Sequence, residues 1–251
     1  LLTAIFTTIV PAVVGTRSQP LTSFGVQPNQ KRDAASDPAA MAQMLNYAAG
    51  VTDLALPDVF YREGDAGGLS FMFAEKPSIG LGKAALAGGP AQALAFIAGR
   101  HLSYFRGGHY LRHLVPTGSG LRAWLLASIK TAIPQFPIPA DMAANVEEHL
   151  AAFKKHMSPQ QIEGLKSHVH KLLAAAPELN LKRWVAAVDM TADRVGFILS
   201  NDLEIASAVV KASPEDAAAI SQKDRLKELQ VFSVSEAYLE LRHRLGINIG
   251  E

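Results

Sequence analysis

The stretch Ala95-Phe96-Ile97-Ala98-Gly99-Arg100-His101-Leu102-Ser103-Tyr104-Phe105-Arg106-Gly107-Gly108-His109-Tyr110 decides how the rest of this chain is interpreted. It follows the breaker Gly88-Gly89-Pro90, and its apolar residues predict a helix from about residue 91 to residue 105. Arg106-Gly107-Gly108 then ends or bends this helix. The sequence therefore places Arg100 and His101 in the second half of a largely apolar helix.

The overall composition is that of a soluble globular protein. The chain has 251 residues, of which 49% are hydrophobic and 19% are charged. Its net charge of +1 gives no general attraction for nucleic acid or acidic lipid, so no nucleic-acid partner is predicted. The absence of cysteine excludes disulfides, thiolate zinc sites and cysteine nucleophiles. We predict a cytoplasmic protein, although cysteine usage does not by itself fix the compartment.

The first residues are apolar but too few to cross a bilayer. Residues 1–15 fall short of the roughly 20 residues that a membrane-spanning helix needs, and they lack the basic start of a signal peptide. We predict a buried helix that continues an upstream region of a longer protein, with a membrane-associated segment as the alternative. The chain is accordingly divided into an N-terminal helical segment and connector, residues 1–50, and a second domain, residues 51–251.

Turn-forming residues separate three short strand patterns, over residues 58–62, 69–73 and 78–82. They predict a small antiparallel sheet. The fold class is therefore α+β and mostly helical, with the sheet beside the helix of residues 91–105. Helices are predicted at residues 1–14, 37–50, 91–105, 121–133, 140–153, 159–176, 180–200, 202–211, 221–232 and 235–245. Asp37 and Ser235 are the expected N-caps of two of these helices.

Three elements in this order resemble the HtpX-type gluzincin metallopeptidases. They are a short sheet ending in Ser78-Ile79-Gly80-Leu81-Gly82, the helix with Gly99-Arg100-His101-Leu102-Ser103, and the stretch Asp189-Met190-Thr191-Ala192-Asp193-Arg194-Val195-Gly196. In that family, a His-Glu-x-x-His helix supplies two zinc ligands and the general base. A downstream Glu-x-x-Ala-Asp pattern supplies the third ligand and an Asp that orients a His. The resemblance covers roughly residues 55–245 and implies a zincin-like fold.

The family's catalytic residues are not present in this sequence. Gly99 and Ser103 stand for the two His residues, and Arg100 stands for the general base. Only Asp189, in place of the third ligand, and Asp193 keep carboxylates. One carboxylate cannot hold zinc, which takes three or four ligands, and the charge of Arg100 opposes a cation. The resemblance therefore predicts a degenerate site with no catalytic residue and no cofactor.

An ion pair is the expected replacement for the metal. We predict that Arg100 contacts Asp189 or Asp193, because carboxylates buried without a partner are costly. A solvent-exposed Arg100 is the alternative. The predicted function is a pseudoenzyme that binds a protein or peptide, or serves as a scaffold, within a larger bacterial protein. Its peptide would add a strand to the sheet edge between the third strand and the motif helix. The sequence indicates no oligomeric state.

A rearranged zinc site is the competing hypothesis. His109 and His113 are four residues apart, so on a helix they would share one face. With His101 and Asp189 they could bind zinc and make the chain a zinc-dependent hydrolase or peptidase. A polar helix end with scattered His residues is the structural alternative. The neighbouring aromatic residues, including Tyr104, are expected to pack in the core.

Overall fold

The computed structural model describes residues 1–175, 179–213 and 220–246. These residues are mostly helical and contain a small three-stranded sheet, as predicted for an α+β chain. Contacts group the chain into two compact units. The boundary expected near residue 50 stays a prediction, because the units join segments that are distant in the sequence. Unit 1 comprises Leu1–Pro20, Phe73–Lys76 and Phe105–Trp184, and unit 2 comprises Leu21–Met72, Pro77–Tyr104 and Val185–Glu251.

The strand pairing of the sheet differs from the prediction. Strand β1 (Asp58–Tyr61) runs parallel to β3 (Ser78–Leu81), and β2 (Leu69–Met72) runs antiparallel to β3. The order β1-β3-β2 makes the sheet mixed, so the expectation of an antiparallel sheet is wrong. Local turn signals predicted the strands but not their partners. All four residues of β3 are buried, as suits the central strand.

The helices of unit 2 follow the predicted pattern closely. Ser235 forms the expected N-cap, with its Oγ accepting a hydrogen bond from the Tyr238 amide. An apolar core joins Phe96 of one helix to Phe197 of another and to the three C-terminal helices. These elements are α2 (Ala40–Thr52), α3 (Lys83–Leu86), α4 (Ala91–Ser103), α10 (Leu203–Ala212), α11 (Gln222–Ser233) and α12 (Glu236–Arg244), with most of α9 (Leu181–Ser200).

Helix α2 begins at Ala40, three residues later than predicted. Asp37 was expected to cap this helix, but its carboxylate is buried and has other partners. It accepts hydrogen bonds from the Tyr61 hydroxyl and from Arg32 Nε, the latter at 2.7 Å. The backbone amide of Ala39 also donates to it, at 2.9 Å. The Asp37 side chain, which the sequence assigned to a helix cap, therefore forms tertiary contacts with Tyr61 and Arg32.

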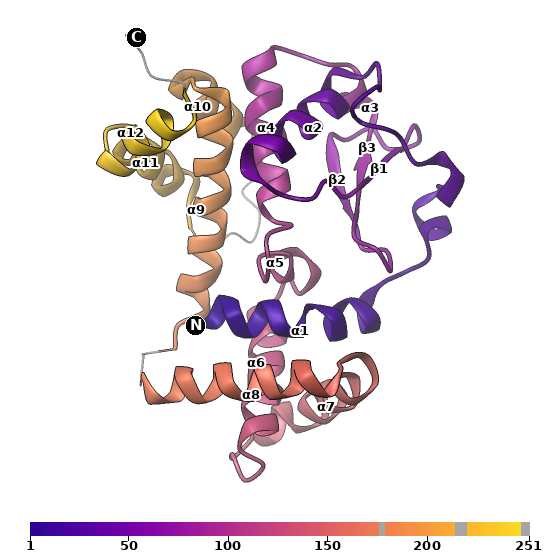
Figure 1. Ribbon diagram of the computed structural model, residues 1–251, viewed down its shortest axis with the longest axis vertical. Coiled ribbons are helices and arrows are strands. Elements are labelled where there is room, and N and C mark those ends of the chain that lie inside the picture. Colours follow the sequence, from indigo (N-terminus) through magenta and orange to yellow (C-terminus); the bar gives the residue numbers. More distant parts are fainter. Residues whose placement is uncertain (176–178, 214–219, 247–251) are drawn as a thin grey trace. The chain divides into compact units, whose positions relative to one another are not determined.

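Helices α4 and α9 lie side by side (Figure 1), and glycines allow their close approach. A Cβ atom added to Gly196 would lie 2.7 Å from the backbone oxygen of Phe96. A Cβ atom added to Gly99 would lie 2.5 Å from Leu199 Cδ1. The two missing side chains let the polar residues of one helix reach those of the other.

We expect Gly196→Ala to lower the free energy of unfolding by about 1–3 kcal/mol, because the backbone oxygen of Phe96 cannot move aside like a side chain. Gly164→Ala in a helix of unit 1 is the matched control, since nothing lies within 4 Å of its added Cβ atom. That variant should gain up to about 1 kcal/mol. Urea unfolding followed by circular dichroism measures both changes. Equal shifts would contradict the close approach.

Unit 1 is built from helices, among which α1 packs against α7 and α8. Figure 1 shows α1 and α8 side by side. Trp184 packs against α1. Its Nε1 donates a hydrogen bond to Thr3 Oγ1 at 3.1 Å, and its ring contacts that of Phe6 edge-on. The end of the helix predicted at residues 159–176 lies outside the described residues. The elements are α1 (Leu2–Arg17), α5 (Leu111–Leu114), α6 (Gly118–Ala132), α7 (Ala143–His156) and α8 (Pro159–Ala174).

The apolar N-terminal helix α1 turns one face inward. Its buried residues include Ile5, Phe6 and Ile9, which are fully enclosed. This agrees with the predicted buried helix. Among the described residues, no helix has both the length and the apolar character that a membrane crossing requires.

Candidate functional site

Four polar side chains meet where α4 faces α9. Arg100 lies on α4, and Tyr104 follows one turn later with helical backbone angles. Asp189 and Asp193 lie one turn apart on α9, so each pair occupies one helix face. Arg100 Nε donates to Asp193 Oδ1 at 2.8 Å, and the Tyr104 hydroxyl donates to Asp189 Oδ1 at 3.0 Å. The predicted ion pair of Arg100 is therefore present, with Asp193 as its partner.

A third helix adds a second arginine to this cluster. Arg225 of α11 donates from Nε to Asp193 Oδ2 and from Nη2 to Asp193 Oδ1, both at 2.7 Å. The Asp193 side chain is 1% exposed and that of Arg225 is 6% exposed, whereas that of Arg100 is 30% exposed. A bidentate pair of this kind fixes both distance and orientation. The carboxylate of Asp193 thus links α4, α9 and α11.

Burial and neighbouring charges shift the pKa values of Arg100 and Tyr104 in this cluster. Burial alone would lower the pKa of Arg100, but the neighbouring Tyr104, Asp193 and Asp189 raise it above its ordinary value. Burial raises the pKa of the Tyr104 hydroxyl, so this group stays protonated and acts as a donor. The guanidinium groups of Arg100 and Arg225 both contact the carboxylate of Asp193, so the centre of this cluster already holds two cations.

Two of the residues assigned to the degenerate site have contacts other than the carboxylates. Gly99 packs against Leu199 of α9, and the Ser103 hydroxyl donates to the backbone oxygen of Arg100 at 2.9 Å. The sequence analysis missed Tyr104 and Arg225 as members of the cluster. Spacing could have identified Tyr104, because it stands four residues after Arg100. No local signal singled out Arg225.

The three His residues of the competing zinc hypothesis have different surroundings. His101 is buried and stacks on Phe71, with ring centroids 4.0 Å apart. Burial, together with the charge of Arg100, lowers the pKa of His101 to about 3. His109 lies in the turn before α5, which holds His113, so the two residues do not belong to one α-helix. Gly108, directly before His109, has a φ of 80°, a conformation that favours glycine.

The residues present at the α4–α9 face do not suit a zinc ion. The guanidinium of Arg100 already occupies the carboxylate of Asp193 and would face the metal with a like charge. Tyr104 engages Asp189 as a neutral hydroxyl. Over the part of the chain that the structure describes, no group of three or more His, Asp or Glu side chains is arranged to hold a metal ion.

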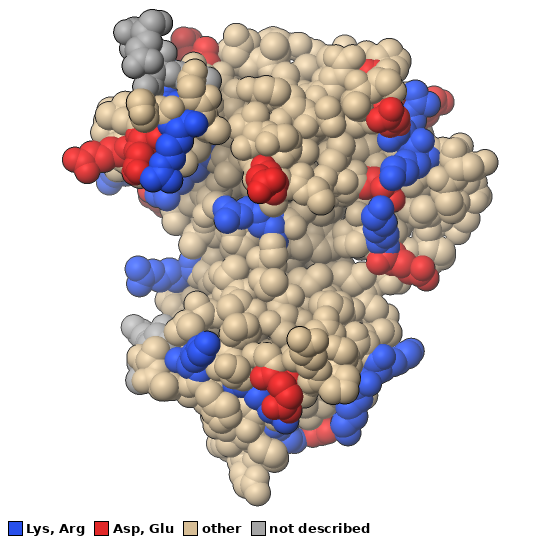
Figure 2. All heavy atoms as spheres, viewed as in Figure 1, with Lys and Arg blue, Asp and Glu red and all other residues tan. Residues whose placement is uncertain are grey.

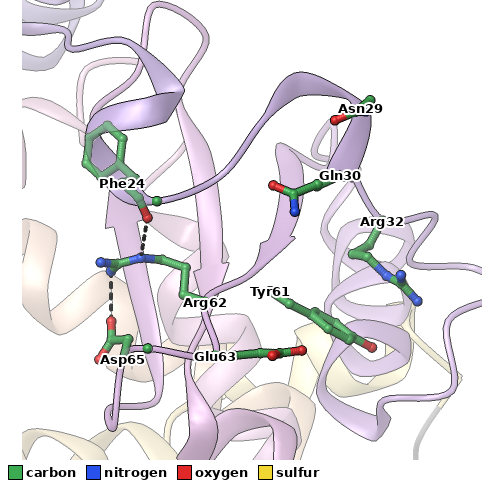
Figure 3. Close-up of a pocket in the computed structure, with 10 residues that line it drawn as sticks. Phe24, Asn29, Gln30, Arg32, Tyr61, Arg62, Glu63 and Asp65 are labelled. Atoms are coloured by element: carbon green, nitrogen blue, oxygen red, sulfur yellow. Dashed lines mark hydrogen bonds and ion pairs between the residues drawn. The ribbon is translucent and has the colours of Figure 1, made fainter.

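A second candidate site is a polar cleft of about 600 Å³ in unit 2 (Figure 3). It lies between the connector before α2 and the loop after β1. Figure 3 shows Arg62 on one side of the cleft, with Gln30 and Glu63 facing the open space. The lining residues are Phe24, Gly25, Asn29, Gln30, Arg32, Tyr61, Arg62, Glu63, Gly64 and Asp65.

The arginines of this cleft are already engaged. Arg62 donates from Nη1 to Asp65 at 2.7 Å and from Nε to the Phe24 oxygen at 3.3 Å. Arg32 pairs with the buried Asp37 and also lies over a tyrosine ring, 4.5 Å from its centroid. Ligand pockets are usually lined mainly by apolar groups with a few convergent polar ones. This lining is mainly polar and holds no nucleophile–base pair, so we assign the cleft no function.

Comparison with protein-family models, with curated proteins and with solved structures finds no match for this chain. The α4–α9–α11 cluster is therefore the feature on which a function can be proposed.

Proposed function

We propose that this chain is a non-catalytic, metallopeptidase-like module that binds a protein or peptide partner within a larger bacterial protein. The observation that carries the proposal is the direct contact between the polar faces of α4 and α9. Arg100 pairs with Asp193, and Tyr104 pairs with Asp189, in helices that resemble the two zinc-binding helices of the HtpX-type family. Arg225 completes the network from α11. An ion-pair network then takes the place of the metal.

We further propose that the His-Glu-x-x-His motif corresponds to residues 100–104 of this chain. The sequence analysis had aligned it with residues 99–103. In His-Glu-x-x-His, the two ligands are four residues apart and face the helix of the third ligand. Arg100 and Tyr104 have this spacing, and they contact Asp193 and Asp189. They therefore stand at the two ligand positions, and His101 stands at the position of the general base.

The chemistry of these residues argues against hydrolysis. Arg100 is a fixed cation, and Tyr104 stays protonated. His101 is a neutral imidazole stacked on Phe71. None of them can activate water in the way that a metal and a carboxylate base do. Partner binding is therefore the role that we propose for this chain.

A peptide partner would dock along an outer strand of the sheet. Strand β3 pairs on both sides, with β1 and with β2, so an added strand next to β3 is excluded. This corrects the expectation that the peptide pairs beside the third strand. Strand addition needs an outer strand. The outer side of β1 already bridges Arg32 at Val59, so we propose β2 as the docking strand.

The direct test combines metal analysis with peptide capture. Elemental analysis of the purified chain, dialysed without chelator, should give far less than one zinc per chain. Peptides retained from a displayed library should be recovered intact by mass spectrometry. Stoichiometric zinc or cleaved peptides would overturn the proposal and direct attention to His101, His109, His113 and Asp189. Failure to retain any peptide would overturn the binding role.

The motif correspondence predicts that a zinc site can be restored. The variant Arg100→His/Tyr104→His/Asp189→Glu should bind about one zinc per chain, because it supplies three ligands at the contact between the helices. Arg225 stays in place to hold Asp193. Isothermal titration with zinc measures the stoichiometry.

The control is the alternative alignment, Gly99→His/Ser103→His/Asp189→Glu. A side chain at residue 99 would meet Leu199, and the Ser103 hydroxyl donates to a backbone oxygen of its own helix rather than to a carboxylate, so no zinc should bind. Zinc binding by this control, or by neither variant when both are folded, would contradict the assignment of Arg100 and Tyr104.

A further inference from the structure

The charges of this chain are divided unevenly between its two units. Unit 1 contains 12 of the 24 Lys and Arg residues but only 6 of the 23 Asp and Glu residues. Unit 2 contains the other 12 basic residues and 17 acidic ones. The overall charge of +1 therefore conceals a basic unit of about +6 and an acidic unit of about −5. Such asymmetry indicates a charged partner more directly than the total does.

The positive excess of unit 1 is on its surface. The ion pairs Lys130–Glu147 and Lys166–Glu163 each engage one of its cations. Figure 2 shows Lys and Arg side chains standing out from the lower part of the surface, over the helices of unit 1, around a smaller group of acidic side chains. The exposed cations with no acidic partner among the described residues are Arg17, Arg106, Arg122, Lys154, Lys155, Lys171, Lys182 and Arg183.

Three of these cations lie at adjoining helix ends. Arg17 is in the last turn of α1, and Lys154 and Lys155 are in the last turn of α7. The two ends are close together, because a Cβ atom on Gly15 would lie 2.4 Å from the imidazole of His156. We call Arg17, Lys154, Lys155 and His156 the basic corner.

The dipoles of α1 and α7 do not neutralise the positive charge of the basic corner. The carboxyl end of a helix carries roughly half a negative charge, so the ends of α1 and α7 offset about one unit. Arg17, Lys154 and Lys155 supply three positive charges, and Glu148 on the same helix α7 offsets at most one more. A surplus of about one to two positive charges therefore remains for an external partner.

We propose that the basic corner of unit 1 is a docking surface for an acidic segment of another protein. The exposed cations there are long side chains with no exposed large hydrophobic residue among them, so the attraction is Coulombic rather than apolar. The net charge of +1 gives the whole chain little general attraction for an extended polyanion such as duplex DNA or an anionic membrane. A short acidic segment needs only the local charge of the basic corner. This surface is separate from the α4–α9–α11 cluster, so either proposal can fail alone.

The test is fluorescence anisotropy with a labelled 12-residue peptide of alternating Glu and Ser. Lys154→Gln/Lys155→Gln should weaken its binding about fivefold or more, and raising NaCl from about 50 to 200 mM should weaken binding to the parent chain several-fold. The matched control is Lys223→Gln/Lys227→Gln on α11, which removes the same charge from exposed positions in unit 2. It should change binding less than about twofold.

Three outcomes would overturn the proposal. Equal weakening by the control would mean that only net charge matters. Absence of peptide binding at low salt, with both proteins folded by circular dichroism, would remove the surface altogether. Tighter binding to a duplex DNA of equal charge, or to phosphatidylserine vesicles, at the same NaCl concentration would assign the basic corner to that other partner.

Discussion

Asp193→Asn is expected to lower the free energy of unfolding by about 3–5 kcal/mol, the cost of leaving buried charges without their partner. Asp193 is the only carboxylate in the structure's described part that contacts both Arg100 and Arg225. The guanidinium of Arg225 is almost fully enclosed and cannot turn to water. A neutral amide would leave this cation uncompensated. Folded domains are stable by roughly 5–15 kcal/mol, so this single substitution should remove a large share of the free energy of unfolding.

The matched control is Asp141→Asn, an exposed aspartate whose side chain forms no hydrogen bond or ion pair with the described residues. That variant should change stability by less than about 0.5 kcal/mol. Chemical denaturation measures both. A double-mutant cycle with Arg225→Met then measures the interaction between Asp193 and Arg225. Removing both partners should lower the free energy of unfolding by less than the sum of the two single losses. Additive losses, or a stable Asp193→Asn variant, would show that the network does not hold the helices together.

The elements that local signals govern were predictable from the sequence. Apolar spacing and breakers place α4 between Pro90 and the glycines at residues 107–108. Ser235 was recognisable as a cap because it precedes a helix and accepts from an amide three residues later. The ion pair of Arg100 was predictable because a buried carboxylate on the facing helix needs a partner.

The pairing of distant residues was not predictable to the same degree. Turn residues fix where β1, β2 and β3 begin and end, yet not that β3 lies between the other two. Arg225 lies 32 residues from Asp193 on a polar helix, where its charge gave no reason to expect burial. The family motif assigned Gly99 to a ligand position, whereas its lack of a side chain serves the packing of α4 on α9. Such contacts depend on how helices are rotated against one another.

The second large effect is expected on acidification, because His101 stays neutral in the folded chain. Burial is the main cause, and the charge of Arg100 adds to it, so the pKa of His101 falls from 6.5 to about 3. The unfolded chain binds a proton at this residue below about pH 6.5, whereas the folded chain does not until about pH 3. Stability contributed by the neutral imidazole is therefore fully present above pH 6.5 and is lost as pH falls.

The free energy of unfolding should fall by up to about 1.4 kcal/mol per pH unit between pH 6 and pH 4 because of His101. The titration of carboxylates adds to this fall. Burial also lowers the pKa of His149, which acts in the same direction. His101→Phe keeps a flat ring against Phe71 while it removes the titration. Its free energy of unfolding should therefore fall less steeply over this range.

The difference in slope separates this effect from a packing effect. A larger ring at residue 101 shifts the stability at every pH by a similar amount, because packing does not depend on protons. Only the loss of a titrating group changes the slope. His170→Phe, at an exposed position on α8, is the control and should keep the parent slope. Parallel curves for the parent chain and His101→Phe would mean that His101 can be protonated in the folded chain, and that the stack on Phe71 does not exclude the charged form.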